Sequence, residues 1–289
     1  MPVGVPVGRG GTPEDDLVTR APCGAGRLGR VRSELSHPYL TGPYPRAFAH
    51  RGWHLDDLAG MENSLAAFRR AVAEGYTYLE TDVHATSDGV VVVHHDDALD
   101  RTTDGHGVVS ALPWSAVSSA KVGGREPVTR LDAALEELPD ALFNIDVKSD
   151  HAVEPVVATL RRCGAFGRVC LASFSDARLA RLRRLGGPEV LTSMGPRSVL
   201  GLWLGGRLRT SVGLPVLGAM AQVPVRYGML RVVTPALLAA ARRLGREVHV
   251  WTIDDEPTMR SLLDAGADGL VSDRPDVLRS VLRSRGAWV

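Results

Sequence analysis

From Pro45 onward, short apolar runs alternate with longer stretches whose apolar positions recur every three or four residues. Short and nearly continuous apolar runs are typical of strands that are buried on both faces of a parallel sheet. Eight such runs can be identified: Arg46–Ala49, Tyr78–Val83, Leu142–Val147, Val169–Ser173, Val190–Thr192, Val216–Met220, Val248–Thr252 and Gly269–Val271. Because eight buried strands alternate with helices, the pattern predicts an α/β fold, a single (β/α)₈ TIM-like barrel. An open doubly wound sheet is the alternative.

The stretches between these runs carry the signals of helix starts and ends. Examples are SLAAFRRAVAEG, TPALLAAARRLG and PTMRSLLDAG, each of which ends in a glycine. Glycine is common just past a helix because it adopts the left-handed conformation without steric cost. Pro257 and Pro275 stand where a helix would begin, and the missing N–H costs nothing there. These signals favour helices as the connections between the strands.

Residues 1–44 differ from the rest of the chain in composition. They are rich in Gly, Pro and Arg, have no sustained periodicity and end in the turn-prone run TGPYP. We expect a loosely ordered N-terminal leader over residues 1–44 and one barrel domain over residues 45–289.

A second departure from the alternation lies between residues 84 and about 130. This segment contains an additional apolar run, VVVVHH, followed by a polar stretch, DRTTDGHGVVSALPWSAV. It predicts a short excursion after the second strand, on the face where barrels of this kind carry their active sites.

Composition excludes several classes of protein. The chain has 34 Lys and Arg against 33 Asp and Glu, a net charge of +1, which argues against bulk electrostatic binding of nucleic acid. Its three cysteines, Cys23, Cys163 and Cys170, lack the number and spacing of a disulfide scaffold or a zinc ribbon. No apolar run is long enough for a transmembrane segment, and the N-terminus lacks the pattern of a secretion signal. These features favour a cytoplasmic location.

Acidic residues occur at alternate positions in two of the predicted strands. Glu80 and Asp82 share one face of the second strand, and Asp146 shares a face of the third with Lys148. Buried carboxylates that face one another need a cation, a proton or a basic side chain. A hard divalent cation, Mg²⁺ or Ca²⁺, is one interpretation, and a salt-bridge network that includes Arg51 and Lys148 is the other.

Histidines mark the ends of two apolar runs. His50 precedes Arg51 at the end of the first strand, and His94 and His95 begin the excursion. Two imidazoles on opposite sides of a substrate can act as general acid and general base, and a guanidinium suits a phosphate group. In isolation, each of these short motifs is more typical of a polar loop.

In order and spacing, the motifs resemble those of the glycerophosphodiester phosphodiesterase family. The resemblance runs from about residue 46 to residue 283. It rests on His50-Arg51-Gly52, Glu62-Asn63-Ser64, Glu80-Thr81-Asp82-Val83, the run V-V-x-H-x-D-x-x-L-D-R-T-T, Ile145-Asp146-Val147-Lys148, Val250-Trp251-Thr252 and Ser272-Asp273-Arg274-Pro275.

The resemblance implies a metal-dependent phosphoric diester hydrolase on a TIM-like barrel. Such an enzyme releases an alcohol and sn-glycerol 3-phosphate from a glycerophosphodiester, without a nucleic-acid partner. It implies catalytic roles for His50 and His95, because the second is the histidine followed by D-x-x-L-x-R. The implied ligands of one divalent cation, Mg²⁺ or Ca²⁺, are Glu80, Asp82 and Asp146, and the implied substrate contacts are Arg51, Asn63, Lys148 and Trp251.

Two alternatives stay open beside this hypothesis. One is a lysophospholipase D acting on lysophospholipids, with Leu202, Trp203 and Leu204 as an exposed lip for acyl chains. The other is a catalytically silent barrel that binds a phosphorylated ligand. The family more often has Glu where this chain has Asp146, which shortens that side chain by one methylene group. The presence of both histidines and all three acidic residues favours the enzyme.

Overall fold

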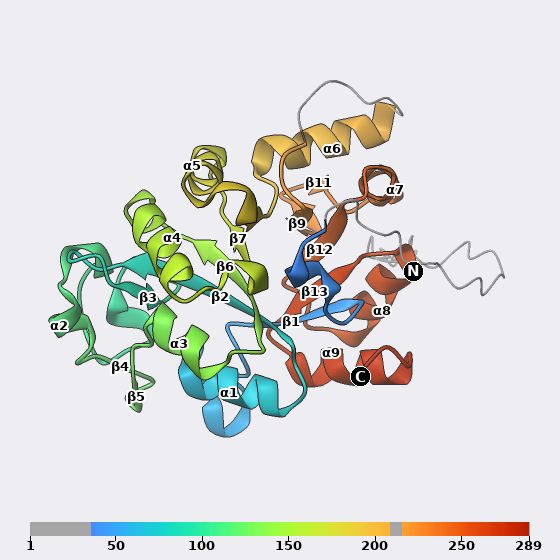
Figure 1. Cartoon of the computed structure of the whole chain (residues 1–289). Coiled ribbons are helices and arrows are strands. Elements are labelled where there is room, and N and C mark those ends of the chain that lie inside the picture. The colour runs from blue at the N-terminus through green and yellow to red at the C-terminus, as the bar shows by residue number, and fades with distance from the viewer. Residues whose placement is uncertain (1–35, 209–215, 289) are drawn as a thin grey trace, which may run out of the picture. The chain divides into compact units, whose positions relative to one another are not determined.

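Eight parallel strands form the centre of the structure, a computed structural model that describes residues 36–208 and 216–288. In chain order the strands are β1 (Arg46–His50), β2 (Tyr78–Ala85), β6 (Leu142–Val147), β7 (Val169–Ala172), β8 (Leu191–Thr192), β9 (Met220–Pro224), β12 (Glu247–Trp251) and β13 (Gly269–Ser272). Hydrogen-bonded neighbours follow the order β8-β7-β6-β2-β1-β13-β12-β9 (Figure 1). Strands that are consecutive in this set are therefore neighbours in space.

The two ends of this order meet and nearly close the sheet. Ser193, directly after β8, forms a parallel bridge with Met220 of β9. The backbone N–H of Met194 donates to the Met220 carbonyl at 2.8 Å, and that of Ala219 donates to Thr192 at 2.8 Å. This closure confirms the TIM-like barrel and excludes the open doubly wound sheet.

Helices cover the outside of the barrel (Figure 1). They are α1 (Leu65–Ala73), α3 (Leu131–Glu137), α4 (Val153–Arg162), α5 (Asp176–Gly186), α6 (Pro196–Leu208), α7 (Pro235–Arg243), α8 (Glu256–Ala265) and α9 (Pro275–Ser284). Ser64, Ser175, Thr234 and Asp255 cap four of these helices through their side-chain oxygens. Among the helices of the described ranges, none has both the length and the apolar character needed to cross a membrane.

Within residues 36–208 and 216–288, seven short 3₁₀ turns supplement the helices. They span Pro38–Thr41, Asp56–Leu58, Leu99–Arg101, Val109–Ala111, Asp150–Ala152, Phe166–Arg168 and Gly187–Glu189.

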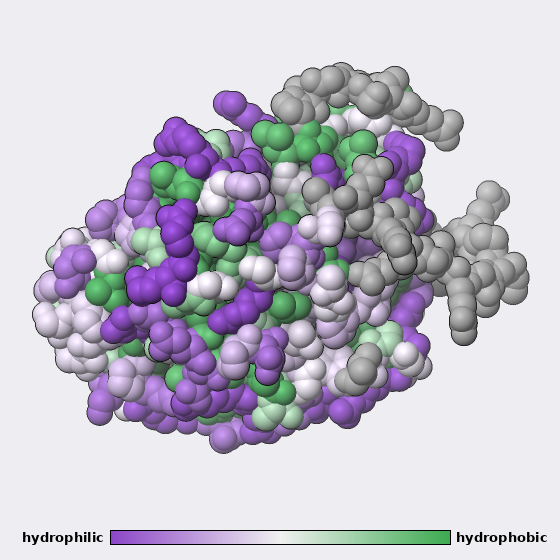
Figure 2. Space-filling model, viewed as in Figure 1, coloured by the Kyte–Doolittle hydropathy of each residue, from purple (hydrophilic) through white to green (hydrophobic). Residues whose placement is uncertain are grey.

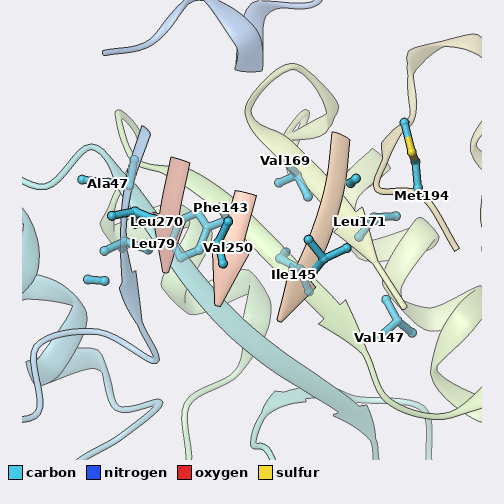
Figure 3. Close-up of a cluster of buried hydrophobic side chains, with 14 of the residues drawn as sticks. Ala47, Leu79, Phe143, Ile145, Val147, Val169, Leu171, Met194, Val250 and Leu270 are labelled. Carbon is cyan, nitrogen blue, oxygen red and sulfur yellow. The ribbon is translucent and has the colours of Figure 1, made fainter. Parts of the chain in front are cut away.

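Side chains alternate along each strand between two apolar layers. Those that point outward pack against the helices, among them Ala47, Leu79, Phe143, Ile145, Val250 and Leu270 (Figure 3). Those that point inward fill the base of the barrel, among them Phe48, Tyr78, Cys170 and Met220. Because this inner layer fills the amino-terminal half, the carboxyl ends of the strands are the open end of the barrel.

An ion pair lies within the base of the barrel. Arg46 Nε donates to Glu247 Oε2 at 2.5 Å, and its Nη2 donates to Glu247 Oε1 at 2.6 Å. Arg46 Nη2 also donates to the carbonyl of Leu40, which is buried together with Tyr39. Residues just before the predicted domain boundary at 45 thus pack into the barrel, whereas most of the predicted leader lies outside the described residues.

The sixth strand begins later than its apolar run indicated. We predicted Val216–Met220, but β9 spans Met220–Pro224, and Leu217 is exposed. Gly218 has a φ of +109°, and a Cβ atom there would overlap the Ser193 carbonyl. This close approach of two backbones ends the loop and sets the start of the strand, so the prediction of the boundaries was wrong.

The excursion after β2 forms a small layer of its own. β3 (Val91–Val93) turns back antiparallel to β2, and it is followed by α2 (Trp114–Val117), β4 (Lys121–Val122) and β5 (Glu126–Pro127). A separate apolar cluster holds it together, which includes Met61, Val92, Leu99, Val109, Val117 and Val122. The predicted excursion is therefore present, and the loop that carries His94 and His95 connects it to the open end of the barrel.

Candidate active site

A cavity of about 740 Å³ lies at the carboxyl ends of the strands. Register brings its charged residues together, because His50 pairs with Glu80 across β1 and β2, and Asp82 pairs with Asp146 across β2 and β6. Of the residues predicted for the site, all but Asn63 line it: His50, Arg51, Glu80, Asp82, His95, Asp146, Lys148 and Trp251.

His50 is held by a carboxylate from the last strand. Its Nδ1 lies 2.6 Å from Asp273 Oδ1, and its Nε2 lies 3.7 Å from Glu80 Oε2. Burial acts to lower the pKa of His50, but the carboxylates of Glu80 and Asp273 outweigh it, and the net pKa lies above the ordinary 6.5. A fixed ring with one nitrogen bound to a carboxylate suits proton transfer through the other nitrogen.

His95 has a similar partner on the excursion side of the cavity. Its Nδ1 lies 2.6 Å from Asp96 Oδ1. The neighbouring His94 is buried, and its Nε2 lies 2.9 Å from the Ala98 carbonyl. His84, which is also buried, lies 3.2 Å from the backbone oxygen of His95 through its Nε2. Of the two adjacent histidines, His95 is therefore the one on the cavity wall, as the motif indicated.

Lys148 bridges two of the predicted metal ligands. Its Nζ lies 2.7 Å from Asp82 Oδ1 and 2.7 Å from Asp146 Oδ2. Burial alone would raise the pKa of Asp82, yet Lys148 and Arg51 hold it below its ordinary value. Burial dominates at Asp146, whose pKa is raised even though Lys148 acts to lower it. The salt-bridge interpretation thus describes two of the three carboxylates.

The third carboxyl, that of Glu80, has no lysine or arginine side chain within ion-pair distance in the described part of the chain, and its basic neighbour is His50, whose Nε2 lies 3.7 Å away. Burial and the charge of Asp82 raise its pKa from 4.5 to about 8. A raised pKa favours the protonated carboxyl unless a cation stabilises its ionised form.

The donor set can be tested against the expected divalent cation. Within residues 36–208 and 216–288, no three acidic or imidazole side chains stand ready around one point for a metal ion. Even so, Asp146 Oδ1 is buried and has no hydrogen-bond partner among the described atoms. This oxygen of Asp146 is thus available to a cation, and the raised pKa of Glu80 indicates that its ionised form lacks a compensating positive charge. Carboxylate oxygens are the ligands that a hard divalent cation prefers, so these three residues fit such an ion. In this structure Lys148 contacts two of them.

Arg51 enters the cavity from a strained turn after β1. Its backbone has a φ of +55°, a conformation that is uncommon outside glycine. Its Nη1 donates to Glu62 Oε1 at 2.8 Å, and its Nε lies 3.2 Å from Asp82 Oδ2. The guanidinium is thereby fixed beside the carboxylates, where it can meet a phosphate.

Asn63 lies behind the cavity wall rather than on it. It is buried, its Nδ2 donates to Asp82 Oδ2 at 3.1 Å, and its Oδ1 accepts from the Thr81 hydroxyl at 2.7 Å. We expected Asn63 to be a polar orienting group at the substrate; in this structure it does not line the cavity, and it contacts Asp82.

Four acidic or basic residues of the site were not singled out from the sequence as site residues. They are Glu62, Asp96, Arg101 and Asp273. Arg101 donates to Asp96 Oδ2 at 2.6 Å and to Glu62 Oε1 at 2.8 Å, so it connects the partners of His95 and Arg51. Each of the four stands within a motif that carried the resemblance, which was the available signal.

The opposite side of the cavity is apolar. Trp251 contacts Phe174 edge to face at a ring separation of 5.7 Å. The wall continues over Met194, Pro196, Val199, Leu200, Trp203, Val223, Pro224, Tyr227, Leu230 and Val232. Leu202, predicted as part of an exposed lip, is buried in the core instead. Its position on the inner face of α6 is the reason, since Leu200 and Trp203 point to the cavity.

Comparison with known proteins identifies the group of proteins that this chain resembles. A model described as the glycerophosphoryl diester phosphodiesterase family matches residues 50–277. The chain is 39% identical over 254 residues to the probable glycerophosphodiester phosphodiesterase 2 of Mycobacterium tuberculosis, which covers 84% of this chain and 92% of that protein.

Two solved structures share the fold. A putative glycerophosphoryl diester phosphodiesterase from Silicibacter pomeroyi superposes with a TM-score of 0.73 at 24% identity, covering 88% of this chain and 100% of that one. A phosphodiesterase from Oleispira antarctica, solved in complex with the product sn-glycerol-3-phosphate, gives a TM-score of 0.69 at 23% identity, covering 85% and 99%.

Proposed function

Because this chain belongs to the glycerophosphoryl diester phosphodiesterase family, we propose that it hydrolyses glycerophosphodiesters to an alcohol and sn-glycerol 3-phosphate through His50 and His95. The observation that supports this most is the shared cavity, where both imidazoles meet Arg51 and Lys148. The reaction adds water across one P–O bond. An oxygen–phosphorus bond forms, the bond to the leaving alcohol breaks, and one proton passes from the attacking oxygen to the alkoxide.

The two histidines carry the proton. One accepts it from the attacking oxygen, and the other donates one to the departing alkoxide. Each ring uses its Nδ1 to contact a carboxylate, Asp273 for His50 and Asp96 for His95, at 2.6 Å in both pairs. The Nε2 atoms are thus left for the substrate.

Basic side chains stabilise the charge that develops on the phosphoryl oxygens. Arg51 and Lys148 both line the cavity and are each held by buried carboxylates, so their charges are positioned before the substrate arrives. Asn63 keeps Asp82 in place, and Trp251 packs against the organic part of the substrate.

Glu80, Asp82 and Asp146 would hold the divalent cation, Mg²⁺ or Ca²⁺. When bound, such an ion supplies further electrostatic stabilisation of the phosphoryl group. The unpartnered oxygen of Asp146 and the raised pKa of Glu80 support this assignment.

A second candidate activity is that of a lysophospholipase D. It is favoured by the apolar wall of the cavity, in which Val199, Leu200 and Leu230 could contact an acyl chain. Lysophosphatidylcholine and glycerophosphocholine share one phosphodiester, so a comparison of their kcat/KM values distinguishes the two substrates.

The test replaces His50 or His95 by Asn and measures hydrolysis of glycerophosphocholine with Mg²⁺, with Ca²⁺ and with a chelator. We expect each substitution to lower kcat by about 10² to 10⁴. His106→Asn is the matched control, because this histidine of the excursion is 83% exposed and lies outside the cavity. Near wild-type turnover in either cavity variant would disprove the roles of the histidines, and full activity in chelator would disprove the metal requirement.

A further inference from the structure

A two-stranded hairpin exposes large apolar side chains at the rim of the cavity. β10 (Arg226–Tyr227) pairs antiparallel with β11 (Leu230–Arg231). Tyr227 is 79% exposed, Met229 is 94% exposed and Leu230 is 44% exposed. Exposed apolar side chains that cluster in this way indicate an interaction surface.

Helix α6 extends this surface. Leu200 is 51% exposed on it, and Trp203 Nε1 donates to the Arg231 carbonyl at 3.2 Å, which ties the helix to the hairpin. Figure 2 shows apolar residues gathered where Figure 1 draws α6. We call Leu200, Tyr227, Met229 and Leu230 the apolar lip. Three of its four members, Leu200, Tyr227 and Leu230, also line the cavity, so the lip borders the opening to the site.

The charge of the surrounding sequence is strongly one-sided. Residues 190–246 contain eight arginines and no Asp, Glu, Lys or His. The chain as a whole has a net charge of +1, so the remainder carries −7 (+1 minus +8). Arg226 and Arg231 flank the tip of the hairpin, and Arg197 lies in the first turn of α6; all three are exposed. Three exposed arginines thus lie on the helix and the hairpin that carry the apolar lip, on a protein whose net charge is only +1.

We propose that the apolar lip docks on the surface of an anionic phospholipid bilayer. Exposed aromatic and aliphatic side chains among arginines are the combination that binds such interfaces, since the side chains enter the headgroup region and the arginines attract its charge. A protein partner would need an apolar patch surrounded by acidic side chains. An anionic bilayer provides an apolar region and negative charge at once. Docking would turn the opening of the cavity toward the membrane. The proposal goes beyond the hydrolytic function and is measured without turnover.

The first experiment is co-sedimentation of the full chain with vesicles. We expect binding to vesicles of phosphatidylcholine mixed with phosphatidylglycerol, little binding to phosphatidylcholine alone, and release at 1 M salt, where charges are screened beyond about 3 Å. Equal binding to both kinds of vesicle, or binding to neither, would overturn the proposal.

Substitutions assign the binding to the lip. Met229→Ser should weaken vesicle binding about tenfold, from the loss of one buried apolar side chain. Arg226→Gln and Arg231→Gln should each weaken it about fivefold. Val108→Ser and Lys121→Gln are matched controls, because both residues are exposed and belong to the excursion. Wild-type vesicle binding in Met229→Ser, Arg226→Gln and Arg231→Gln alike would contradict the assignment.

Two further readouts separate docking from other effects. Hydrolysis of soluble glycerophosphocholine should be unchanged in Met229→Ser, because Met229 does not line the cavity, and this shows that the variant is folded. Light scattering should give the same mass for this variant and the wild type. If instead the wild type forms an oligomer that Met229→Ser abolishes, the lip binds a second copy of the chain and the proposal fails. If His50→Asn loses hydrolysis but still binds vesicles, the docking proposal holds independently of the proposed function.

Discussion

The ammonium group of Lys148, which directly follows β6, lies 2.7 Å from Asp82 on the adjacent strand β2. The same nitrogen lies 2.7 Å from Asp146, two residues before it in the chain. Burial acts to lower the pKa of Lys148, but the two carboxylates outweigh it and raise this pKa above its usual value. The lysine thus remains charged and stabilises two acidic residues that burial would otherwise disfavour.

Replacing Lys148 by Met should therefore destabilise the protein by about 3 kcal/mol, because two buried carboxylates lose their partner. Chemical denaturation at neutral pH with a chelator measures the change. Adding Mg²⁺ or Ca²⁺ should stabilise the variant more than the wild type, because the ion no longer competes with an ammonium group. Lys121→Met is the exposed control. An unchanged free energy of unfolding in Lys148→Met would show that the bridge contributes nothing.

Arg101 should act as a positioning residue, since it touches the carboxylates that hold Arg51 and His95 but does not line the cavity. In Arg101→Ala we expect kcat to fall on the order of 10², because small displacements of reacting groups are costly. Arg101→Lys should recover part of the loss. Arg69→Ala, which removes an exposed ion pair with Glu137, should leave kcat unchanged. A defect confined to KM would contradict a role in positioning both groups.

Asp273 should be needed to orient His50. Its carboxylate contacts Nδ1 of His50 at 2.6 Å and Nε2 of His54 at 3.2 Å. Asp273→Asn keeps the shape of the side chain but removes the charge, and we expect kcat to fall about 10² to 10⁴ with little change in thermal stability. The same substitution at Asp264, an exposed residue paired with Arg285, is the control. Turnover above a tenth of the wild-type value in Asp273→Asn would contradict this role.

The ion pair in the barrel base predicts a dependence of stability on pH. Burial would raise the pKa of Glu247, yet hydrogen bonds from Arg46 and His249 lower it from 4.5 to about 2. Because folding lowers this pKa, the ion pair stabilises the folded protein fully above pH 4.5. This stabilisation is lost as the pH falls toward 2.

Glu247→Gln should accordingly cost about 3 kcal/mol at pH 7. The difference in the free energy of unfolding between variant and wild type should become smaller as the pH decreases below 4.5. Urea denaturation at several pH values measures it. Glu137→Gln, at the exposed pair with Arg69, should show almost no gap at either pH. A gap that stays constant down to pH 3 would show that the charge of Glu247 is not the cause.

The sequence alone determined which residues could carry the chemistry. Alternation of side chains along a strand placed Glu80 with Asp82 and Asp146 with Lys148 on shared faces, and eight buried strands with intervening helices required a parallel sheet. Local patterns of this kind depend on neighbours a few residues apart, so they can be interpreted without the fold. The choice of His95 over His94 came from the resemblance to the family, in which the histidine is followed by D-x-x-L-x-R.

Tertiary structure alone decided how these residues meet. Lys148 reaches Asp82 because β2 and β6 pair in one register, and Asp273 reaches His50 across 223 residues because the barrel closes β13 onto β1. The position of Asn63 behind Asp82 likewise follows from packing. Such contacts are set by the closure of the barrel, in which every strand fixes its neighbours, and no local pattern in the chain contains that constraint.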